Sequence, residues 1–281
     1  MLGSRVFTAV VLLAVLAGLL FIDNRWPFLV FLAIVVAVTL QEWIRLSAPG
    51  LKFIPEVAGV LLGLATLSQA SAWMGSTSSY LAAFELAAVV SGLVWIFVVP
   101  VQIASAKLDR HKSSLGWSLF APVCLFATWG VLAQIWLISG AWELLSLLAI
   151  VWIADIFAYF GGRKFGKEKL APAISPGKTR EGAAIGLFGV MLWMIGSAFL
   201  SGSYASRVLD LWGWAGVVIT ALVLGLLAIL GDLFESMLKR QAQVKDSGRL
   251  LPGHGGVYDR VDAVVAVLPV AFLIVSDFWY Q

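Results

Sequence analysis

The stretch LWGWAGVVITALVLGLLAILG, residues 211–231, contains no charged side chain and no proline. At 1.5 Å of rise per residue, an α-helix of this length crosses the roughly 30 Å hydrocarbon core of a bilayer. The whole chain of 281 residues is 61% apolar and only 12% charged, whereas a soluble domain carries about 25% charged residues. This composition excludes a soluble enzyme, a disordered chain and a nucleic-acid-binding module. It predicts a helical membrane protein.

Nine runs of about 20 apolar residues predict the fold class, an all-α polytopic membrane protein with about nine transmembrane helices. The first run resembles a signal peptide, but it is long for one and no clear cleavage site follows it, so we expect a retained anchor. The single cysteine, Cys124, has no intrachain partner and leaves the redox compartment open. The runs are residues 5–22, 26–46, 53–74, 80–100, 116–138, 141–161, 182–201, 211–231 and 259–279.

Positive charges fall almost entirely on one side of this arrangement. Of the 19 Lys and Arg residues, 17 lie in the N-terminal segment or in the connections after the second, fourth, sixth and eighth helices. Only Arg25 and Arg207 lie on the other side. Short connections rich in Lys and Arg stay in the cytoplasm. We therefore predict a multi-pass protein of the cytoplasmic (inner) membrane, with its N-terminus in the cytoplasm and its C-terminus outside.

The chain changes character near residue 140. Residues 1–140 form an N-terminal transmembrane region of five spans with short connections. Residues 141–281 hold the other four spans and two long polar connections, 162–181 and 232–259, both predicted to be cytoplasmic. We expect this second region to be catalytic, because it contains most of the polar side chains that chemistry requires.

The connection that begins at Asp232 opens with a helix-compatible segment. Residues 232–246 contain no Gly or Pro, so they can extend the preceding helix into the cytoplasm. Asp232, Ser236 and Lys239 then share one helix face. A carboxylate, a hydroxyl and a cation would point in the same direction.

A glycine-rich loop and two further carboxylates follow. The stretch Pro252-Gly253-His254-Gly255-Gly256 cannot be helical, and its backbone N–H groups can approach an anion closely. Asp259 and Asp262 open the last helix, where carboxylates are favoured. With the nearby Lys and Arg residues, this set suits a metal-bound polyphosphate. The alternative is an ordinary loop whose cations only fix the topology.

The spacing of these residues resembles the signature of phosphatidate cytidylyltransferases, also called CDP-diacylglycerol synthases. The resemblance implies a multi-span homodimer in which Mg²⁺ assists the conversion of CTP and phosphatidate to CDP-diacylglycerol and pyrophosphate. It also implies that Asp232 and Asp259 hold the metal, while the presence of a second cation stays open. The match covers 27 residues and comprises Ser236, Lys239, Arg240, Lys245, Asp246, Gly248, Leu251, Pro252, Gly253, His254, Gly255, Gly256, Asp259, Arg260 and Asp262.

The other long connection carries a second element of the same family. Ser175-Pro-Gly-Lys-Thr-Arg-Glu-Gly182 predicts a turn before a helix, capped by Thr179 or Ser175. It is no Walker loop, because the earlier glycine and the preceding strand are missing. The stretch resembles the S-P-x-K-T-x-E-G element of the cytidylyltransferases. At the two x positions it has Gly177 and Arg180, where members of that family often carry Lys and a large apolar residue.

Asp155, near the cytoplasmic end of the sixth span, needs a partner or water there. Its carboxylate is either paired for packing or a wall of the nucleotide or metal site, and Tyr159 lies on the same face one turn later. We expect catalytic roles for Lys239, Arg240, Lys245, Asp246, His254 and Arg260. We expect substrate contacts from Asp155, Tyr159, Ser175, Lys178, Thr179, Glu181, Ser236, Gly253, Gly255, Gly256 and Asp262.

Other polar residues give weaker signals. Gln41-Glu42-Trp43 faintly resembles a family feature, but an interfacial Trp beside a snorkelling charge is the favoured interpretation. Glu85 and Glu143 are expected to be solvated at the outer ends of spans, and His111 is expected on the surface.

The chemistry implied by the resemblance needs no Ser, Cys or His nucleophile, because the lipid phosphate is already anionic. The protein has to hold two anions together and stabilise the leaving pyrophosphate. The expected partners are CTP, phosphatidate, membrane lipid and a second copy of the chain, with no nucleic acid. Two alternatives stay open: a CTP-dependent kinase of polyprenol or another lipid, and a transporter of an anionic solute.

Overall fold

A computed structural model of the chain describes residues 11, 14–20, 22, 24–74, 81–105, 114–251, 253 and 255–279. Half of the expected first span, 5–22, lies outside the described residues, as does His111 with the rest of residues 106–113.

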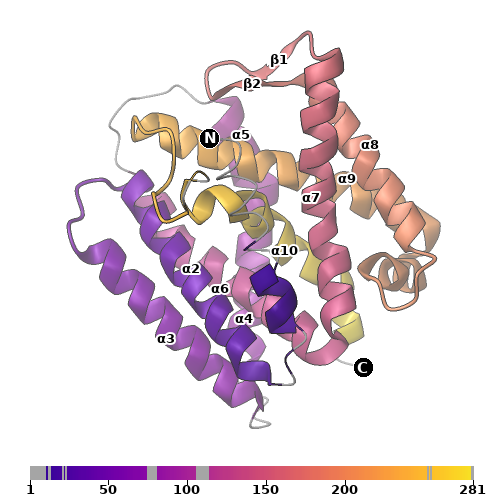
Figure 1. Cartoon of the computed structure of the whole chain (residues 1–281), viewed down its shortest axis with the longest axis horizontal. Coiled ribbons are helices and arrows are strands. Elements are labelled where there is room, and N and C mark those ends of the chain that lie inside the picture. Colours follow the sequence, from indigo (N-terminus) through magenta and orange to yellow (C-terminus); the bar gives the residue numbers. More distant parts are fainter. Residues whose placement is uncertain are drawn as a thin grey trace. The chain divides into compact units, whose positions relative to one another are not determined.

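The described residues are mostly helical, as expected (Figure 1). Each of the eight expected spans from 26–46 onward coincides with a helical segment. The elements are α2 (Arg25–Ser47), α3 (Ile54–Met74), α4 (Leu81–Leu93), the π-helical segment η2 (Val94–Val98), α5 (Val99–Ala104), α6 (Leu115–Ser139), α7 (Ala141–Phe165), β1 (Lys169–Ala171), β2 (Ser175–Thr179), α8 (Arg180–Ser197), α9 (Tyr204–Gln241) and α10 (Tyr258–Trp279).

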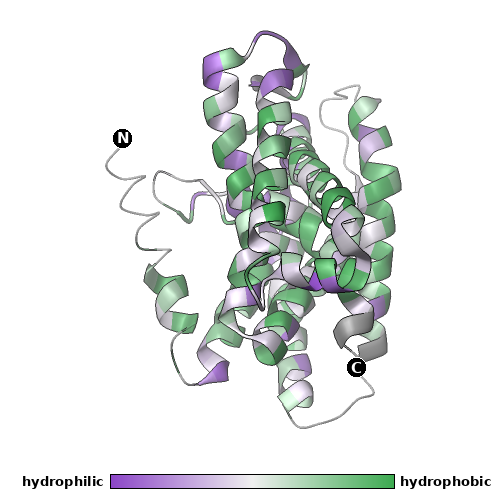
Figure 2. Ribbon diagram, turned by 90° about the vertical axis from the view of Figure 1, so that its right-hand side faces the viewer, coloured by the Kyte–Doolittle hydropathy of each residue, from purple (hydrophilic) through white to green (hydrophobic). Residues whose placement is uncertain are grey.

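Six helical segments in the described part of the chain are long and apolar enough to cross a membrane. They are α2, α3, residues 83–104, α6, α7 and α9. Figure 2 shows hydrophobic residues along most of the length of the helices. The protein is thus a polytopic helical membrane protein, and the count of nine spans and the orientation of the termini stay predictions.

Two local features differ from the all-helical expectation. Residues 169–179 form an antiparallel hairpin in which Lys169 pairs with Thr179 and Ala171 with Ser175. In addition, α9 ends at Gln241 instead of continuing to Asp246, and Gln243 has a positive φ of 58°. The chain therefore leaves the helix earlier than the absence of Gly and Pro suggested.

The chain divides into two compact units that differ from a simple split near residue 140. Unit 1 comprises residues 1–87, 109–133 and 238–261, and unit 2 comprises residues 88–108, 134–237 and 262–281. Residues 238–261 of the signature thus belong to the same unit as α2 and α3, whereas its first and last residues, Ser236 and Asp262, belong to unit 2. The division at residue 140 concerned function and stays a prediction.

In unit 1, α2 and α3 lie side by side (Figure 1). Asn24 caps the start of α2, since its side chain accepts a hydrogen bond from the Trp26 N–H. Near the other end of α2, the Ser47 hydroxyl lies 2.7 Å from that of Ser118 in α6. The last turns of α2 are therefore tied to a neighbouring helix.

In unit 2, α7 packs closely along α8, and the β1–β2 hairpin joins them (Figure 1). Small residues allow this approach: a Cβ at Gly186 would stand 2.9 Å from the carbonyl oxygen of Ala154. Thr179 caps α8, as expected, by accepting a hydrogen bond from the Gly182 N–H at 3.2 Å.

The expectation that Glu143 is solvated is wrong. Its side chain is fully buried and forms an ion pair of 2.5 Å with Arg207, which also donates to the Ser139 hydroxyl. Sequence alone hid this pair, because Glu143 begins α7 and Arg207 lies in the first turn of α9. The arginine supplies the compensating charge that a buried carboxylate requires.

Replacing Arg207 with Ala should destabilise the protein by roughly 3–5 kcal/mol, because the carboxylate of Glu143 would be left buried without its cation. Thermal unfolding in detergent, followed by the fraction that remains monodisperse, measures the loss. The double variant Glu143→Leu/Arg207→Met should recover most of it. An Arg207→Ala protein as stable as the wild type would contradict the pairing.

Candidate active site

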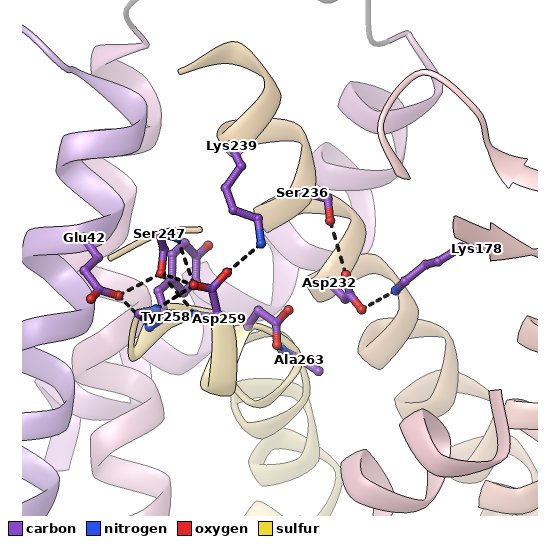
Figure 3. Close-up of polar contacts among 11 residues, drawn as sticks. Glu42, Lys178, Asp232, Ser236, Lys239, Ser247, Tyr258, Asp259 and Ala263 are labelled. Atoms are coloured by element: carbon purple, nitrogen blue, oxygen red, sulfur yellow. Dashed lines mark hydrogen bonds and ion pairs between the residues drawn. The ribbon is translucent and has the colours of Figure 1, made fainter. Parts of the chain in front are cut away.

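In unit 2, Asp232 of α9 lies between a lysine and a serine (Figure 3). One carboxylate oxygen, Oδ2, pairs with the ammonium of Lys178 from β2. The other, Oδ1, accepts a hydrogen bond of 3.3 Å from Ser236, one helical turn later, as the spacing predicted. The side chains of Lys178 and Asp232 are 29% and 28% exposed, so both remain accessible to a ligand.

These charges border a cavity of about 540 Å³ within unit 2. The cavity is bounded by α7, the hairpin, α8 and α9. Most of the lining residues are small or apolar, and the polar side chains come from six residues in α7, β2 and α9. Its lining includes Ala154, Asp155, Ala158, Tyr159, Gly162, Arg163, Lys178, Thr179, Gly182, Ala183, Gly186 and Asp232. Asp155 therefore lines this cavity, and its role as a wall of a nucleotide or metal site stays a prediction.

A further carboxylate lies near Asp232. Asp262, in the first turns of α10, interacts electrostatically with Asp232, Asp155 and Lys178. Its Oδ1 also accepts a hydrogen bond from the Ala263 N–H at 2.8 Å. The three carboxylates repel one another, and the ammonium of Lys178 offsets part of their negative charge.

Glu181 is occupied by the backbone. Its Oε2 accepts hydrogen bonds from the N–H groups of Lys167 at 2.9 Å and Glu168 at 3.2 Å. The hydrogen bond from the Lys167 N–H is the largest cause that holds the pKa of Glu181 below its ordinary value. The carboxylate therefore ties the end of α7 to the start of α8 and positions the hairpin that carries Lys178.

In unit 1, Asp259 is the centre of a second polar group (Figure 3). Its Oδ1 pairs with the ammonium of Lys239 at 2.6 Å. Its Oδ2 accepts hydrogen bonds from the Ser247 N–H and hydroxyl, both at 2.9 Å, and from the Gly256 N–H at 2.8 Å. The Asp259 side chain is only 5% exposed, so it organises the signature loop from within.

The glycines of this loop serve its own packing. Gly255 has a φ of 84°, and its N–H donates to the Leu251 carbonyl at 3.1 Å. With the Gly256 N–H donating to Asp259, two donors expected to face an anion are used inside the loop in this structure. Their contact with a substrate stays a prediction.

The interpretation of Glu42 and Trp43 as an interfacial Trp with a snorkelling charge is wrong. Glu42 is 3% exposed and Trp43 is fully buried. The Glu42 Oε2 accepts hydrogen bonds from the Ser247 hydroxyl at 2.9 Å and the Tyr258 N–H at 2.8 Å. The Trp43 ring stacks on Tyr258 with the ring centres 4.9 Å apart.

The remaining expected site residues are spread over the polar connections. Arg240 and Lys245 line a second cavity of about 450 Å³ in unit 1. Asp246, Gly253 and Arg260 are exposed, and Ser175 lies in β2. His254 lies outside the described residues.

Comparison with known proteins identifies the family of the chain. A model described as the cytidylyltransferase family matches residues 3–278 of the chain. The chain belongs to the cytidylyltransferase family. The resemblance noted in the signature segment is thereby confirmed over nearly the whole length.

Three bacterial relatives of this cytidylyltransferase family member carry the same name, phosphatidate cytidylyltransferase. The Pseudomonas aeruginosa protein is 35% identical over 96% of this chain and 95% of its own. The Haemophilus influenzae protein is 33% identical over 96% of both chains. The Helicobacter pylori J99 protein is 34% identical over 93% of this chain and 87% of its own.

Glu181→Gln should loosen the turn between α7 and β1 at neutral pH. The carboxylate accepts hydrogen bonds best when ionised, and a depressed pKa means that its stabilisation is present above the unfolded-state pKa of about 4.3. That stabilisation disappears as the pH falls through the lower folded-state value. Hydrogen exchange of the amides of Lys167 and Glu168, compared between wild type and variant at each pH, measures it.

The exchange difference should be large at pH 7 and vanish in acid. The variant Glu168→Gln is the control, because Glu168 pairs with Arg180 through an exposed ion pair. Equal protection of the two amides in wild type and Glu181→Gln at pH 7 would disprove the assignment.

Proposed function

We propose that this chain transfers the cytidylyl group of CTP to phosphatidate and releases pyrophosphate. A phosphate oxygen of phosphatidate attacks the α-phosphorus of CTP, and the bond from that phosphorus to the oxygen bridging to the β-phosphate breaks. The products are CDP-diacylglycerol and pyrophosphate. Family membership and the shared name of the relatives support this reaction.

The observation that carries the proposal is the Asp232–Lys178 pair on the wall of the cavity in unit 2. A lysine there can neutralise phosphate oxygens, while the small and apolar walls leave room for a substrate. Arg163 lines the same cavity and adds a second cation. Phosphoryl-type transfer depends mainly on positioning and on charge stabilisation, and these residues provide both.

A magnesium ion fits the donors at Asp232. Among the described residues, no three His, Cys, Asp or Glu side chains form a group able to enclose a metal. Mg²⁺ typically uses one or two carboxylates and takes its other ligands from water and substrate phosphates. The carboxylate of Asp232 offers hard oxygen donors beside the cavity, and its lysine partner occupies a position that suits a cation.

We further propose Asp259 as the second protein ligand. Its Oδ1 pairs with the ammonium of Lys239, and its Oδ2 accepts hydrogen bonds from the N–H and hydroxyl of Ser247 and from the Gly256 N–H (Figure 3). When bound, the ion would supply positive charge to the phosphate oxygens of CTP. Lys178 and Lys239 would then be available to the two phosphate-bearing substrates.

The remaining parts of the proposal concern location and assembly. Concentration of Lys and Arg in the connections that carry these residues supports an active site on the cytoplasmic side of the inner membrane. A site at a helix end lets the lipid enter from the inner leaflet while CTP arrives from the cytosol. A homodimer and a second cation belong to the same proposal.

Labelled CTP separates this reaction from the kinase alternative. With purified protein, phosphatidate and Mg²⁺, ³²P at the α-position should appear in the lipid and ³²P at the γ-position in pyrophosphate. A kinase would transfer the γ-label to lipid instead. Turnover in detergent without a second compartment is also incompatible with simple transport.

Asp232→Asn should lower kcat by about 10²–10³-fold, because an electrostatic contact to the reacting phosphates is lost. The matched control is Asp210→Asn, the same change at an exposed position of α9 that lies before the non-helical Gly213 and does not line the cavity. The control should keep wild-type turnover and both variants should remain folded. Near-normal turnover of Asp232→Asn would remove the metal assignment.

A further inference from the structure

Glu42 is a buried carboxylate in the described part of unit 1 that the proposed chemistry does not use. It lies near the end of α2 and is 3% exposed. Burying a carboxylate costs several kcal/mol unless it is hydrogen-bonded or paired. Such a residue is retained at a cost in stability, so its contacts indicate what it does.

The hydrogen bonds drawn for Glu42 in Figure 3 all join it to residues of the signature. Its Oε2 accepts from the Ser247 hydroxyl at 2.9 Å and from the Tyr258 N–H at 2.8 Å. Tyr258 is the first residue of α10, directly before Asp259. One oxygen of Glu42 therefore holds both the loop and the start of the helix that carries Asp259.

The Ser247 hydroxyl links the two carboxylates. Its oxygen lies 2.9 Å from the Glu42 Oε2 and 2.9 Å from the Asp259 Oδ2. A hydroxyl has one proton to donate and two lone pairs that accept. It can therefore donate fully to only one of these oxygens, and the orientation of the hydroxyl depends on both of them.

Backbone packing fixes the position of Glu42 against the loop. A Cβ at Gly248 would overlap the Glu42 Oε1, and a Cβ at Gly256 would overlap the Ser247 hydroxyl. The adjacent Trp43 stacks on Tyr258 with an interplanar angle of 10°. Three contacts of α2, two polar and one aromatic, thus fall on Ser247 and Tyr258, which contact or adjoin Asp259.

We propose that Glu42 is a positioning residue for Asp259, acting through Ser247 and the Tyr258 N–H. This inference rests on the proposed function, because it assigns to Asp259 a task in that reaction. It gives α2, a helix remote in sequence from the signature, a defined role in the site. The requirement is geometric: an acceptor oxygen must stand where the Glu42 Oε2 stands.

Glutamine should satisfy this requirement. Its carbonyl oxygen, placed where the Glu42 Oε2 stands, can accept from both the Tyr258 N–H and the Ser247 hydroxyl, as the carboxylate oxygen does. Aspartate keeps the charge but is one methylene shorter, so it should not reach both partners. Alanine removes the acceptor altogether.

The test measures kcat for CDP-diacylglycerol formation, together with thermal stability in detergent, for Glu42→Gln, Glu42→Asp and Glu42→Ala. Glu42→Ala and Glu42→Asp should lose about 10- to 100-fold, as residues that orient a metal ligand typically do. Glu42→Gln should stay within about threefold of the wild type. If Glu42→Ala does not fold, the contrast between Asp and Gln decides the outcome.

Glu56→Ala is the matched control. Glu56 lies in α3 of the same unit, forms an ion pair of 2.5 Å with Arg45, and is exposed. It should keep the wild-type kcat. Wild-type kcat in Glu42→Asp would overturn the inference, and so would a loss in Glu42→Gln as large as in Glu42→Asp. Absence of CDP-diacylglycerol formation by the wild type would instead overturn the proposed function.

Discussion

Two aspartate–lysine pairs recur in this structure, and each combines a carboxylate, an ammonium and a serine hydroxyl. Asp232 pairs with Lys178 and accepts a hydrogen bond from Ser236, whereas Asp259 pairs with Lys239 and accepts from Ser247. In a chain with only 12% charged residues, a carboxylate removed from water needs such compensation. An ammonium on a flexible stem can leave when a stronger cation arrives. In the proposed function, these pairs mark the positions for a cation and for phosphates.

Two further carboxylates, Glu181 and Glu42, hold the segments that carry Lys178 and Asp259. In unit 2, Glu181 binds the backbone at the end of α7 and so fixes the hairpin from which Lys178 extends. In unit 1, Glu42 holds Ser247, which hydrogen-bonds to Asp259, and Tyr258, which directly precedes Asp259. Glu181 and Glu42 therefore position the side chains of the two aspartate–lysine pairs. Both use backbone N–H groups, whose positions the fold determines.

Local patterns predicted what depends on neighbours in sequence. The approximate places of the helices followed from apolar runs, the Asp232–Ser236 contact followed from helical spacing, and Thr179 was one of the two caps expected before α8. The burial of Glu42 and Glu143 did not follow, because their partners Ser247 and Arg207 lie far away along the chain. The hairpin was also missed, since Pro and Gly in Ser175–Thr179 disfavour a strand. Sequence patterns carry no information on such long-range contacts.

The role proposed for Asp232 is to bind the divalent cation that accompanies CTP. Electron paramagnetic resonance of Mn²⁺, titrated into purified protein with CTP and without phosphatidate, tests it without relying on turnover. We expect saturable Mn²⁺ binding in the wild type and in Asp210→Asn, and at least about tenfold weaker binding in Asp232→Asn, as loss of a metal contact predicts. Unchanged Mn²⁺ affinity in Asp232→Asn would contradict the account.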